Sequence, residues 1–316
     1  MNKLNEINTT VVLATYNGKD FLEKQVESIL QQTLLPTEII FVDDGSTDGT
    51  RDLLLSIQKS YSGIIKIELV FREKNLGYIL NFVDGIKRAK GDIIFLCDQD
   101  DEWHIDKVKN TLSFFSLYKD CIAVHSNTSI IDRVGNIIRE NAQDYRLYSK
   151  KLSLNELVKK VNYPGMALAF KKEKIASKLL ELVDSGIKLP THDWVICFLA
   201  TIQDGFYISD ETLTYRRYTG NNVALQLASK NLSVENRIEG IDIYIKLYEF
   251  LSDYESKFLL EKQELNKYIL NAIKRKKYLG NRNILLWGCN FINILRYPSI
   301  RAYFADLISI IKSIKK

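Results

Sequence analysis

Short, almost wholly apolar runs alternate with amphipathic segments over the first hundred residues, and this alternation restricts the fold more than any other feature. β-Branched and aromatic residues predict four strands, over residues 9–14, 38–42, 64–71 and 92–97. Between them apolar residues recur at helical spacing, most clearly over 21–32 and 78–89. Strands that are apolar throughout are buried on both faces, as in a parallel sheet covered by helices. The first half therefore predicts a doubly wound, mostly parallel α/β sheet.

The middle and the end of the chain carry different patterns. A pair of strands is expected over residues 122–126 and 129–132, followed by a turn at 134–136. Apolar residues at helical spacing predict long helices over 234–251 and 254–278. At 316 residues the chain is longer than one ordinary domain. We therefore expect an α/β domain over residues 1–222 and a helical, basic extension over residues 223–316.

The composition is that of an ordinary globular protein, with 46% hydrophobic and 26% charged residues, and it excludes a disordered or fibrous chain. The 4 cysteines lie far apart, so neither a zinc site nor a disulfide framework is expected, and reduced thiols suit a reducing compartment. No signal peptide is apparent, and no apolar run approaches the ~20 residues that span a bilayer. We expect a cytoplasmic protein, soluble or peripheral to the inner face of the plasma membrane.

The formal net charge of +5 is concentrated at the end of the chain. From residue 270 onward ten Lys and Arg residues accompany a single acid, Asp306. Residues 282–316 also interleave these bases with Trp, Phe, Tyr, Ile and Leu. Two interpretations stay open: amphipathic helices that dock on an anionic membrane, or a helical cap packed on the catalytic domain.

Acidic residues follow the fourth predicted strand, at the edge where a doubly wound sheet binds its ligands. Asp98, Asp100 and Asp101 place three carboxylates within four residues, and they repel one another unless a cation lies among them. Mg²⁺ or Mn²⁺ binds through one or two carboxylates together with substrate phosphates. An isolated acidic turn is more often a solvated helix cap. Because polar residues also follow the first two strands, a nucleotide-diphosphate site is favoured here.

The polar ends of the first two strands suggest how a nucleotide is held. Tyr16 offers a ring on which a base stacks, and a carboxylate at residues 43–44 accepts the imide N–H of uracil or thymine, or a ribose hydroxyl. Alternatively, these residues form ordinary turns. Asp48 is expected only to cap the helix that follows.

Five blocks in this order resemble the GT-A glycosyltransferases of family 2, inverting enzymes that take sugars from nucleotide diphosphates. The blocks are residues 12–18, 41–48, 75–77, 89–92 and 98–101. The resemblance covers residues 8 to about 222 and implies a Rossmann-like GT-A fold. Within the family, residues 98–103 and 192–194 most resemble bacterial rhamnosyltransferase-like members.

The resemblance implies a role for each matching residue. Asp44 reads the base, and the other contacts to the nucleotide sugar fall to Thr15, Tyr16, Asn17, Asn75, Asp98, Asp100 and Arg216. Asp100 and Asp101 hold the Mg²⁺ or Mn²⁺ ion. Asp193 is the catalytic base, although an Asp in the first turn of a helix is otherwise a dipole-stabilising residue. The acceptor side is formed by Gly165, Met166, His192 and Trp194.

Two positions depart from the family pattern. Relatives often carry a His in the motif that closes the site, where this chain has Tyr218, so its contact to metal or phosphate would pass to Tyr218, Arg216 or Arg217. Arginine suits a diphosphate because guanidinium pairs with phosphate through two hydrogen bonds. His104 lies in a Trp-x-Pro-like stretch that lacks the proline.

Other functions fit less well. A sugar-phosphate nucleotidyltransferase would carry a glycine-rich loop with Arg and Lys after the first strand, and a dehydrogenase a G-x-G-x-x-G motif; residues 15–18 match neither. A nucleic-acid-binding function rests on the basic end alone and leaves the aspartates unused. We expect a dTDP-sugar donor such as dTDP-rhamnose, with UDP-hexoses as the alternative. By resemblance, the acceptor is a cell-surface glycan on a lipid carrier.

Overall fold

The computed structural model describes residues 3–143, 148–159, 163–219, 233–252, 259–297 and 299–314. Contacts divide the chain into two compact units. The first unit comprises Met1–Leu152, Tyr163–Leu182 and Thr191–Thr219, and the second Ser153–Asn162, Val183–Pro190 and Gly220–Lys316. The expected domain boundary after residue 222 stays a prediction, because residues 220–232 lie outside the described part.

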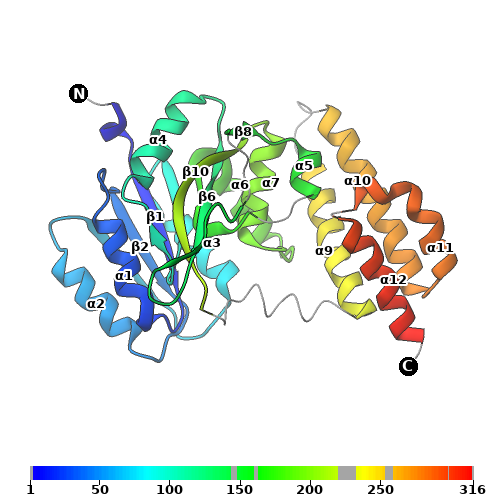
Figure 1. Cartoon of the computed structure of the whole chain (residues 1–316), viewed down its shortest axis with the longest axis horizontal. Coiled ribbons are helices and arrows are strands. Elements are labelled where there is room, and N and C mark those ends of the chain that lie inside the picture. The colour runs from blue at the N-terminus through cyan, green and yellow to red at the C-terminus, as the bar shows by residue number, and fades with distance from the viewer. Residues whose placement is uncertain are drawn as a thin grey trace. The chain divides into compact units, whose positions relative to one another are not determined.

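A single sheet organises the first unit (Figure 1), and its ten described strands follow the order β3-β2-β1-β4-β9-β6-β10-β5, with β7 beside β6 and β8 beside β10. The four predicted strands are parallel neighbours. Antiparallel β9 then separates β4 from β6, and β10 runs parallel to β6. The doubly wound, mostly parallel fold is thus confirmed. The strands are β1 Thr9–Thr15, β2 Glu38–Asp43, β3 Lys66–Phe71, β4 Ile93–Asp98, β5 Glu102–Trp103, β6 Ala123–Ile131, β7 Ile137–Arg139, β8 Lys150–Lys151, β9 Leu168–Lys171 and β10 Phe206–Arg217.

Helices cover both faces of this sheet because alternate strand residues point to opposite sides. Val11 and Leu13 of β1 belong to one apolar cluster with side chains of α1, α2 and α4. Val12 faces the other way, where a Cβ on Gly85 of α3 would lie 2.3 Å from its side chain. α3 also contacts α7. The helices of this part are α1 Lys19–Leu30, α2 Thr50–Ser60, α3 Tyr78–Arg88, α4 Lys107–Leu117, α6 Lys172–Asp184 and α7 His192–Ile202, with the 3₁₀ turns η1 Lys3–Glu6 and η2 Gly165–Ala167.

Two predicted strands differ from the structure. The third begins at Lys66 rather than at residue 64, because the backbone N–H of Ile64 closes a turn onto the carbonyl of Tyr61 (3.1 Å). The expected pair over 122–126 and 129–132 is one continuous strand, β6, which pairs antiparallel with β7 and β9. Asn127 and Thr128, which separate the two predicted strands, are buried in the sheet and pair with β10, where that strand bulges.

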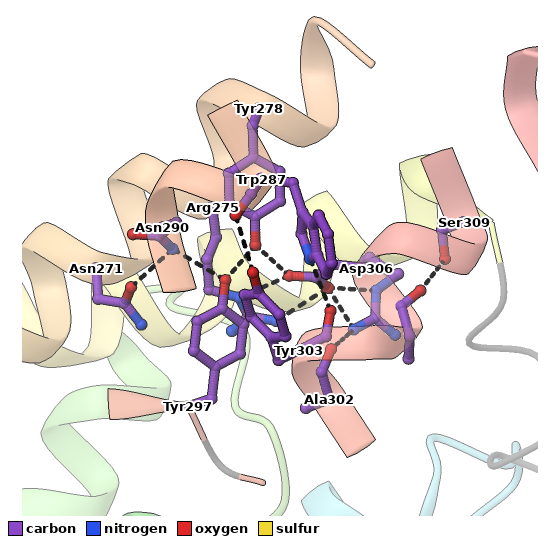
Figure 2. Close-up of polar contacts among 12 residues, drawn as sticks. Asn271, Arg275, Tyr278, Trp287, Asn290, Tyr297, Ala302, Tyr303, Asp306 and Ser309 are labelled. Atoms are coloured by element: carbon purple, nitrogen blue, oxygen red, sulfur yellow. Dashed lines mark hydrogen bonds and ion pairs between the residues drawn. The ribbon is translucent and has the colours of Figure 1, made fainter. Parts of the chain in front are cut away.

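The second unit is helical, as expected for the end of the chain. Its described elements are α5 Leu154–Lys159, α9 Val234–Ser252, α10 Leu259–Gly280, α11 Ile284–Cys289, η3 Asn290–Arg296 and α12 Ile300–Ile314. Residues 254–258 of the second predicted helix lie outside the described part. Figure 2 shows a polar network inside this unit, centred on Asp306 of α12. Among the described helices none is long and apolar enough to cross a membrane.

Candidate active site

The ends of β1 and β2 are bound together by side chains that the sequence assigned to nucleotide binding. Thr15 is buried and donates its hydroxyl to Asp43 Oδ2 (3.1 Å). Asn17 has a left-handed backbone (φ 50°), and its Oδ1 accepts from the N–H of Thr47 (2.8 Å). Between them Tyr16 is 48% exposed. Of these three predicted residues, Tyr16 therefore offers the open surface on which a base could stack.

Gln99 joins the end of β1 to the acidic run after β4. Its Oε1 accepts from the N–H of Tyr16 (2.8 Å), and its Nε2 donates to the carbonyl of Tyr16 (3.0 Å). A Cβ on Gly18 would lie 2.1 Å from Gln99 Oε1, so only glycine leaves room for this side chain. This role of Gln99 was not predicted from the sequence, because Gln99 stands among aspartates with more evident chemistry.

Asp44 holds the loop that precedes α3. Its two carboxylate oxygens accept from the backbone N–H groups of Leu76 (2.9 Å) and Gly77 (2.8 Å), and Asp44 is buried. Asn75 is exposed, and its Oδ1 also accepts from Gly77 N–H (3.0 Å). The predicted contacts of Asp44 to a base and of Asn75 to a nucleotide sugar stay predictions. The contacts in hand fix where α3, and therefore Tyr78, begins.

The acidic run lies at the carboxyl end of β4, half-buried at Asp98 and Asp100 and buried at Asp101. Asp101 Oδ1 accepts from the backbone N–H of Arg217 (2.9 Å), while its buried Oδ2 has no hydrogen-bond partner among the described residues. Burial, and next the charge of Asp100, raise the pKa of Asp98 to about 7, although Arg216 opposes the rise. Burial also raises the pKa of Asp100 and of Asp101. A cation beside these carboxylates would stabilise their ionised forms against burial and against their mutual repulsion.

The chemistry of these oxygens fits a hard divalent ion. In the part of the chain that the structure describes, no three His, Cys, Asp or Glu side chains converge as a ready metal site. Mg²⁺ and Mn²⁺ sites that act on nucleotides normally draw further oxygens from the phosphates. Asp100 and Asp101 therefore stay the predicted protein ligands, with the diphosphate completing the shell.

The two arginines at the end of β10 have different surroundings. Arg217 is buried: its Nε donates to the carbonyl of Asp100 (3.0 Å), and its guanidinium also pairs with Glu102. Arg216 is half-exposed, and its charge partly opposes the rise in the pKa of Asp98 and Asp100 that burial causes. Tyr218 is 53% exposed. Arg216 and Tyr218 are thus the residues of this motif that remain available to a phosphate, whereas Arg217 holds the loops together.

The candidate base, Asp193, lies in the first turn of α7 and touches the predicted acceptor turn. Its Oδ2 accepts from the N–H of Gly165 (3.1 Å), and its Oδ1 accepts from the N–H of Trp194 (2.7 Å). Thr191 caps the helix, and its side chain accepts from the N–H of Trp194. Each carboxylate oxygen keeps a second lone pair, which could accept the proton of a hydroxyl.

Two buried side chains hold the same turn from below, and the sequence did not reveal either. Lys107 Nζ donates to the carbonyl of Met166 (2.8 Å) and to the hydroxyl of Thr214 (2.7 Å). His125 Nε2 lies 3.2 Å from the carbonyl of Pro164. Burial lowers the pKa of Lys107 to about 7.

The start of α3 contacts α7 beside Asp193. The ring of His192 stacks on Phe82 (4.1 Å between centroids) and meets the edge of Tyr78 (5.9 Å). Burial, and then the charges of Asp193 and Asp98, raise the pKa of Tyr78. Its hydroxyl therefore lies near both the predicted base and the acidic run. Met166, His192 and Trp194 are buried, so their predicted contact with an acceptor stays a prediction.

Comparison with known proteins identifies this arrangement. Residues 10–177, more than half of the chain, match the family model described as Glycosyl transferase family 2. The chain belongs to glycosyltransferase family 2. Membership confirms the family and the class of enzyme expected from the five blocks, and it does not favour the nucleotidyltransferase alternative.

Family 2 relatives of this chain vary in extent. TuaG of Bacillus subtilis, named for teichuronic acid biosynthesis, is 33% identical over 40% of this chain, and the match spans only about half (48%) of TuaG. The dTDP-rhamnosyl transferase RfbG of Shigella flexneri is 28% identical over 69% of the chain and 75% of RfbG. An uncharacterized glycosyltransferase of Rickettsia typhi, RT0329, is 27% identical over 93% of the chain and 91% of its own length.

Solved structures support the fold. Residues 1–349 of S. aureus TarS, in a complex with UDP-GlcNAc, superpose with a TM-score of 0.59 at 17% identity, covering 98% of this chain and 92% of that one. A mannosyltransferase from Pyrobaculum calidifontis, in complex with GDP-Man and Mn²⁺, gives a TM-score of 0.53 at 17% identity over 98% and 86%. The GT-A fold is therefore confirmed.

Proposed function

We propose that this protein is an inverting glycosyltransferase that moves a sugar from a nucleoside diphosphate to a glycan or lipid-linked acceptor. The observation that carries the proposal is the position of Asp193, bonded to the acceptor turn at Gly165 and close enough to affect the acidic run through its charge. In a direct displacement the acceptor hydroxyl loses its proton as its oxygen bonds to the anomeric carbon, and the nucleoside diphosphate leaves. Asp193 would take that proton.

We propose that the donor lies along the edge formed by Tyr16, Asp98, Asp100 and Arg216. Tyr16 would stack on the base, and Arg216 would pair with the diphosphate. A divalent ion held by Asp100 and Asp101 would neutralise the leaving group when it is bound. dTDP-rhamnose is the first donor to test, because RfbG carries that activity in its name, and UDP-GlcNAc is the second, because TarS binds it.

The cytoplasm is the proposed compartment. Cys97, Cys121, Cys197 and Cys289 are all free thiols, and Cys289 is exposed. Free thiols persist where glutathione and thioredoxin keep them reduced, and nucleotide sugars would be supplied on the same side of the membrane.

The sharpest test is the Asp193→Asn variant. General-base catalysis contributes ~10²–10⁴-fold, so transfer to a hydroxyl acceptor should fall by that factor. Donor binding, measured by calorimetry, should be retained because no proposed donor contact is removed. Azide attacks as an anion and needs no base, so azide in place of the acceptor should consume donor equally fast with variant and wild type.

The same experiment separates a lost base from a distorted turn, because the asparagine amide must face one of the two N–H groups that Asp193 accepts. A variant that azide does not rescue would mean that Asp193 holds the turn and is not the base. Asp84→Asn, on the outer side of α3 where Asp84 pairs with Arg72 and Arg88, is the matched control. It should leave both reactions unchanged.

Metal dependence is tested on Asp100, since Asp101 also bonds the backbone of Arg217. The nucleotide should raise the melting temperature more with Mn²⁺ or Mg²⁺ than in EDTA, and Asp100→Asn should remove most of that difference. Full transfer activity in EDTA would contradict the proposed ion.

A further inference from the structure

The last helix, α12, buries its single acidic residue, Asp306, and exposes a stripe of apolar side chains. Asp306 is 0% exposed and pairs with the guanidinium groups of Arg237 (Nε to Oδ1, 2.7 Å) and Arg275 (Nε to Oδ2, 3.0 Å); Figure 2 shows it among Arg275 and Tyr278. Residues spaced by four, four and three along the other side are exposed: Ile300 64%, Phe304 47%, Ile308 47% and Ile311 37%. This spacing places them in one stripe.

The preceding 3₁₀ segment, η3, shows the same inversion. Asn290 and Asn293 are buried and hydrogen-bonded to each other (2.7 Å), whereas Ile292 is 86% and Leu295 is 74% exposed. The two exposed apolar sets meet at Tyr303, since the rings of Phe291 and Phe304 lie 6.0 Å and 5.4 Å from its ring. Single exposed apolar residues are ordinary, but a contiguous group of them marks a binding surface.

The exposed charges of α12 have one sign. They are Arg301 and Lys312, which flank the apolar stripe. From residue 270 onward the only acidic side chain is Asp306, and Asp306 is consumed inside the unit. We propose that the apolar surface of α12 and η3, with its flanking arginines and lysines, docks on an anionic lipid bilayer.

A second copy of the chain would be the other occupant of such an apolar surface, but the charges disfavour it. A twofold contact places the same patch on both sides, so the basic residues of one copy would face those of the other, and the patch offers no acid to pair with them. An anionic bilayer supplies negative headgroups to every base, each contributing about 1 kcal/mol, and an apolar layer to the isoleucines. Asp306 is buried inside the unit, so it takes no part in contact with a second copy or with a bilayer.

Docking on a bilayer concerns where the protein works, and it does not depend on the proposed sugar transfer. It is tested by flotation of the full chain with vesicles of phosphatidylcholine, with and without phosphatidylglycerol, at low and high salt. We expect binding to the anionic vesicles that salt weakens. The Ile300→Gln/Ile308→Gln pair should lose binding by at least tenfold, and Arg301→Gln/Lys312→Gln should lose it by roughly tenfold or more, as two charges imply.

The matched control is Leu55→Gln/Leu117→Gln, which changes two apolar residues with 49% and 74% exposure in the first unit and should leave binding unchanged. Circular dichroism and melting temperature establish that each variant is folded. Equal recovery with neutral and anionic vesicles, or equal loss in the control pair, would overturn the proposal. A wild-type dimer that the isoleucine variant converts to a monomer, without vesicle binding, would assign the surface to a second copy instead.

Discussion

At the carboxyl edge of the sheet, single side chains repeatedly join two loops. Asp44 connects β2 to the loop before α3, Gln99 connects the acidic run to Tyr16, and Lys107 connects the acceptor turn to β10. Each of them makes two hydrogen bonds with a neighbouring loop or strand, so the geometry of the edge depends on a few polar groups. Residues that a motif marks as binding a ligand also shape the site without one.

Gln99 allows this to be measured. In Gln99→Ala the two bonds to the backbone of Tyr16 disappear, and each contributes about 0.5–1.5 kcal/mol to stability. We expect the donor KM to rise several-fold with kcat little changed, because Tyr16 would be less well placed for the base. Gln58→Ala on α2, which removes one hydrogen bond to the carbonyl of Ile67 on β3, should lose comparable stability per bond but keep the KM. Equal KM values for both variants would contradict the role of Gln99.

Residue identities at the site could be predicted only as far as motif and burial agree. Tyr16 and Asp98 lie at the carboxyl ends of β1 and β4, and Asp193 lies in the first turn of α7, where the sequence shows strands and a helix clearly. Their roles in binding and catalysis stay predictions. Lys107 and His125 could not be found, since their partners are backbone carbonyls of a turn at residues 164–166 that tertiary structure alone brings near.

At the scale of the elements, prediction succeeded where one physical signal dominates. The buried parallel strands are continuous apolar runs, and the structure has all four of them. The prediction of two strands in place of β6 was wrong because the polar residues Asn127 and Thr128 are buried within the strand and pair with β10, which periodicity does not show. β9 was not predicted as a strand, since its place between β4 and β6 depends on partners far along the chain.

The opposite edge of the sheet depends on Glu38, the first residue of β2. Its carboxylate accepts from Thr10 Oγ1 of β1 (2.7 Å), Lys66 Nζ of β3 (2.6 Å) and the N–H of Lys90 before β4 (2.6 Å). Burial alone would raise the pKa of Glu38, but these bonds outweigh burial and lower it. The ionised form is therefore stabilised by folding, above the ordinary pKa of about 4.5.

Glu38→Gln should thus destabilise the protein by ~1–3 kcal/mol at pH 7. The difference from wild type should shrink at acid pH, as the pH falls through the lowered pKa of Glu38 and the wild-type carboxylate takes up its proton. Urea titrations at both pH values measure it. Glu68→Gln, half-exposed on β3, is the control and should change stability by less than about 0.5 kcal/mol. A difference independent of pH would show that the charge of Glu38 is not what matters.

For the whole molecule, the second unit is held by charge as much as by apolar packing. Asp306→Asn would leave Arg237 and Arg275 without their buried counter-charge, which costs about 3–5 kcal/mol. We expect calorimetry to show an earlier transition for the helical unit and an unchanged one for the α/β unit. Asp242→Asn, whose partner Lys276 is exposed, should shift neither transition measurably. A uniform shift of both transitions would mean that the units unfold together.

The way the chain is shared between the units has a consequence for its synthesis. Residues 153–162 and 183–190 belong with the helices that begin at Val234, although strands of the α/β unit precede and follow them. Leu157 and Leu189 in these stretches are buried. During synthesis these two stretches leave the ribosome well before α9 and α10. Their apolar side chains therefore stay exposed until those helices have been made. A gene shortened after residue 219 would never supply those helices, and its product should aggregate although it contains every described strand of the sheet.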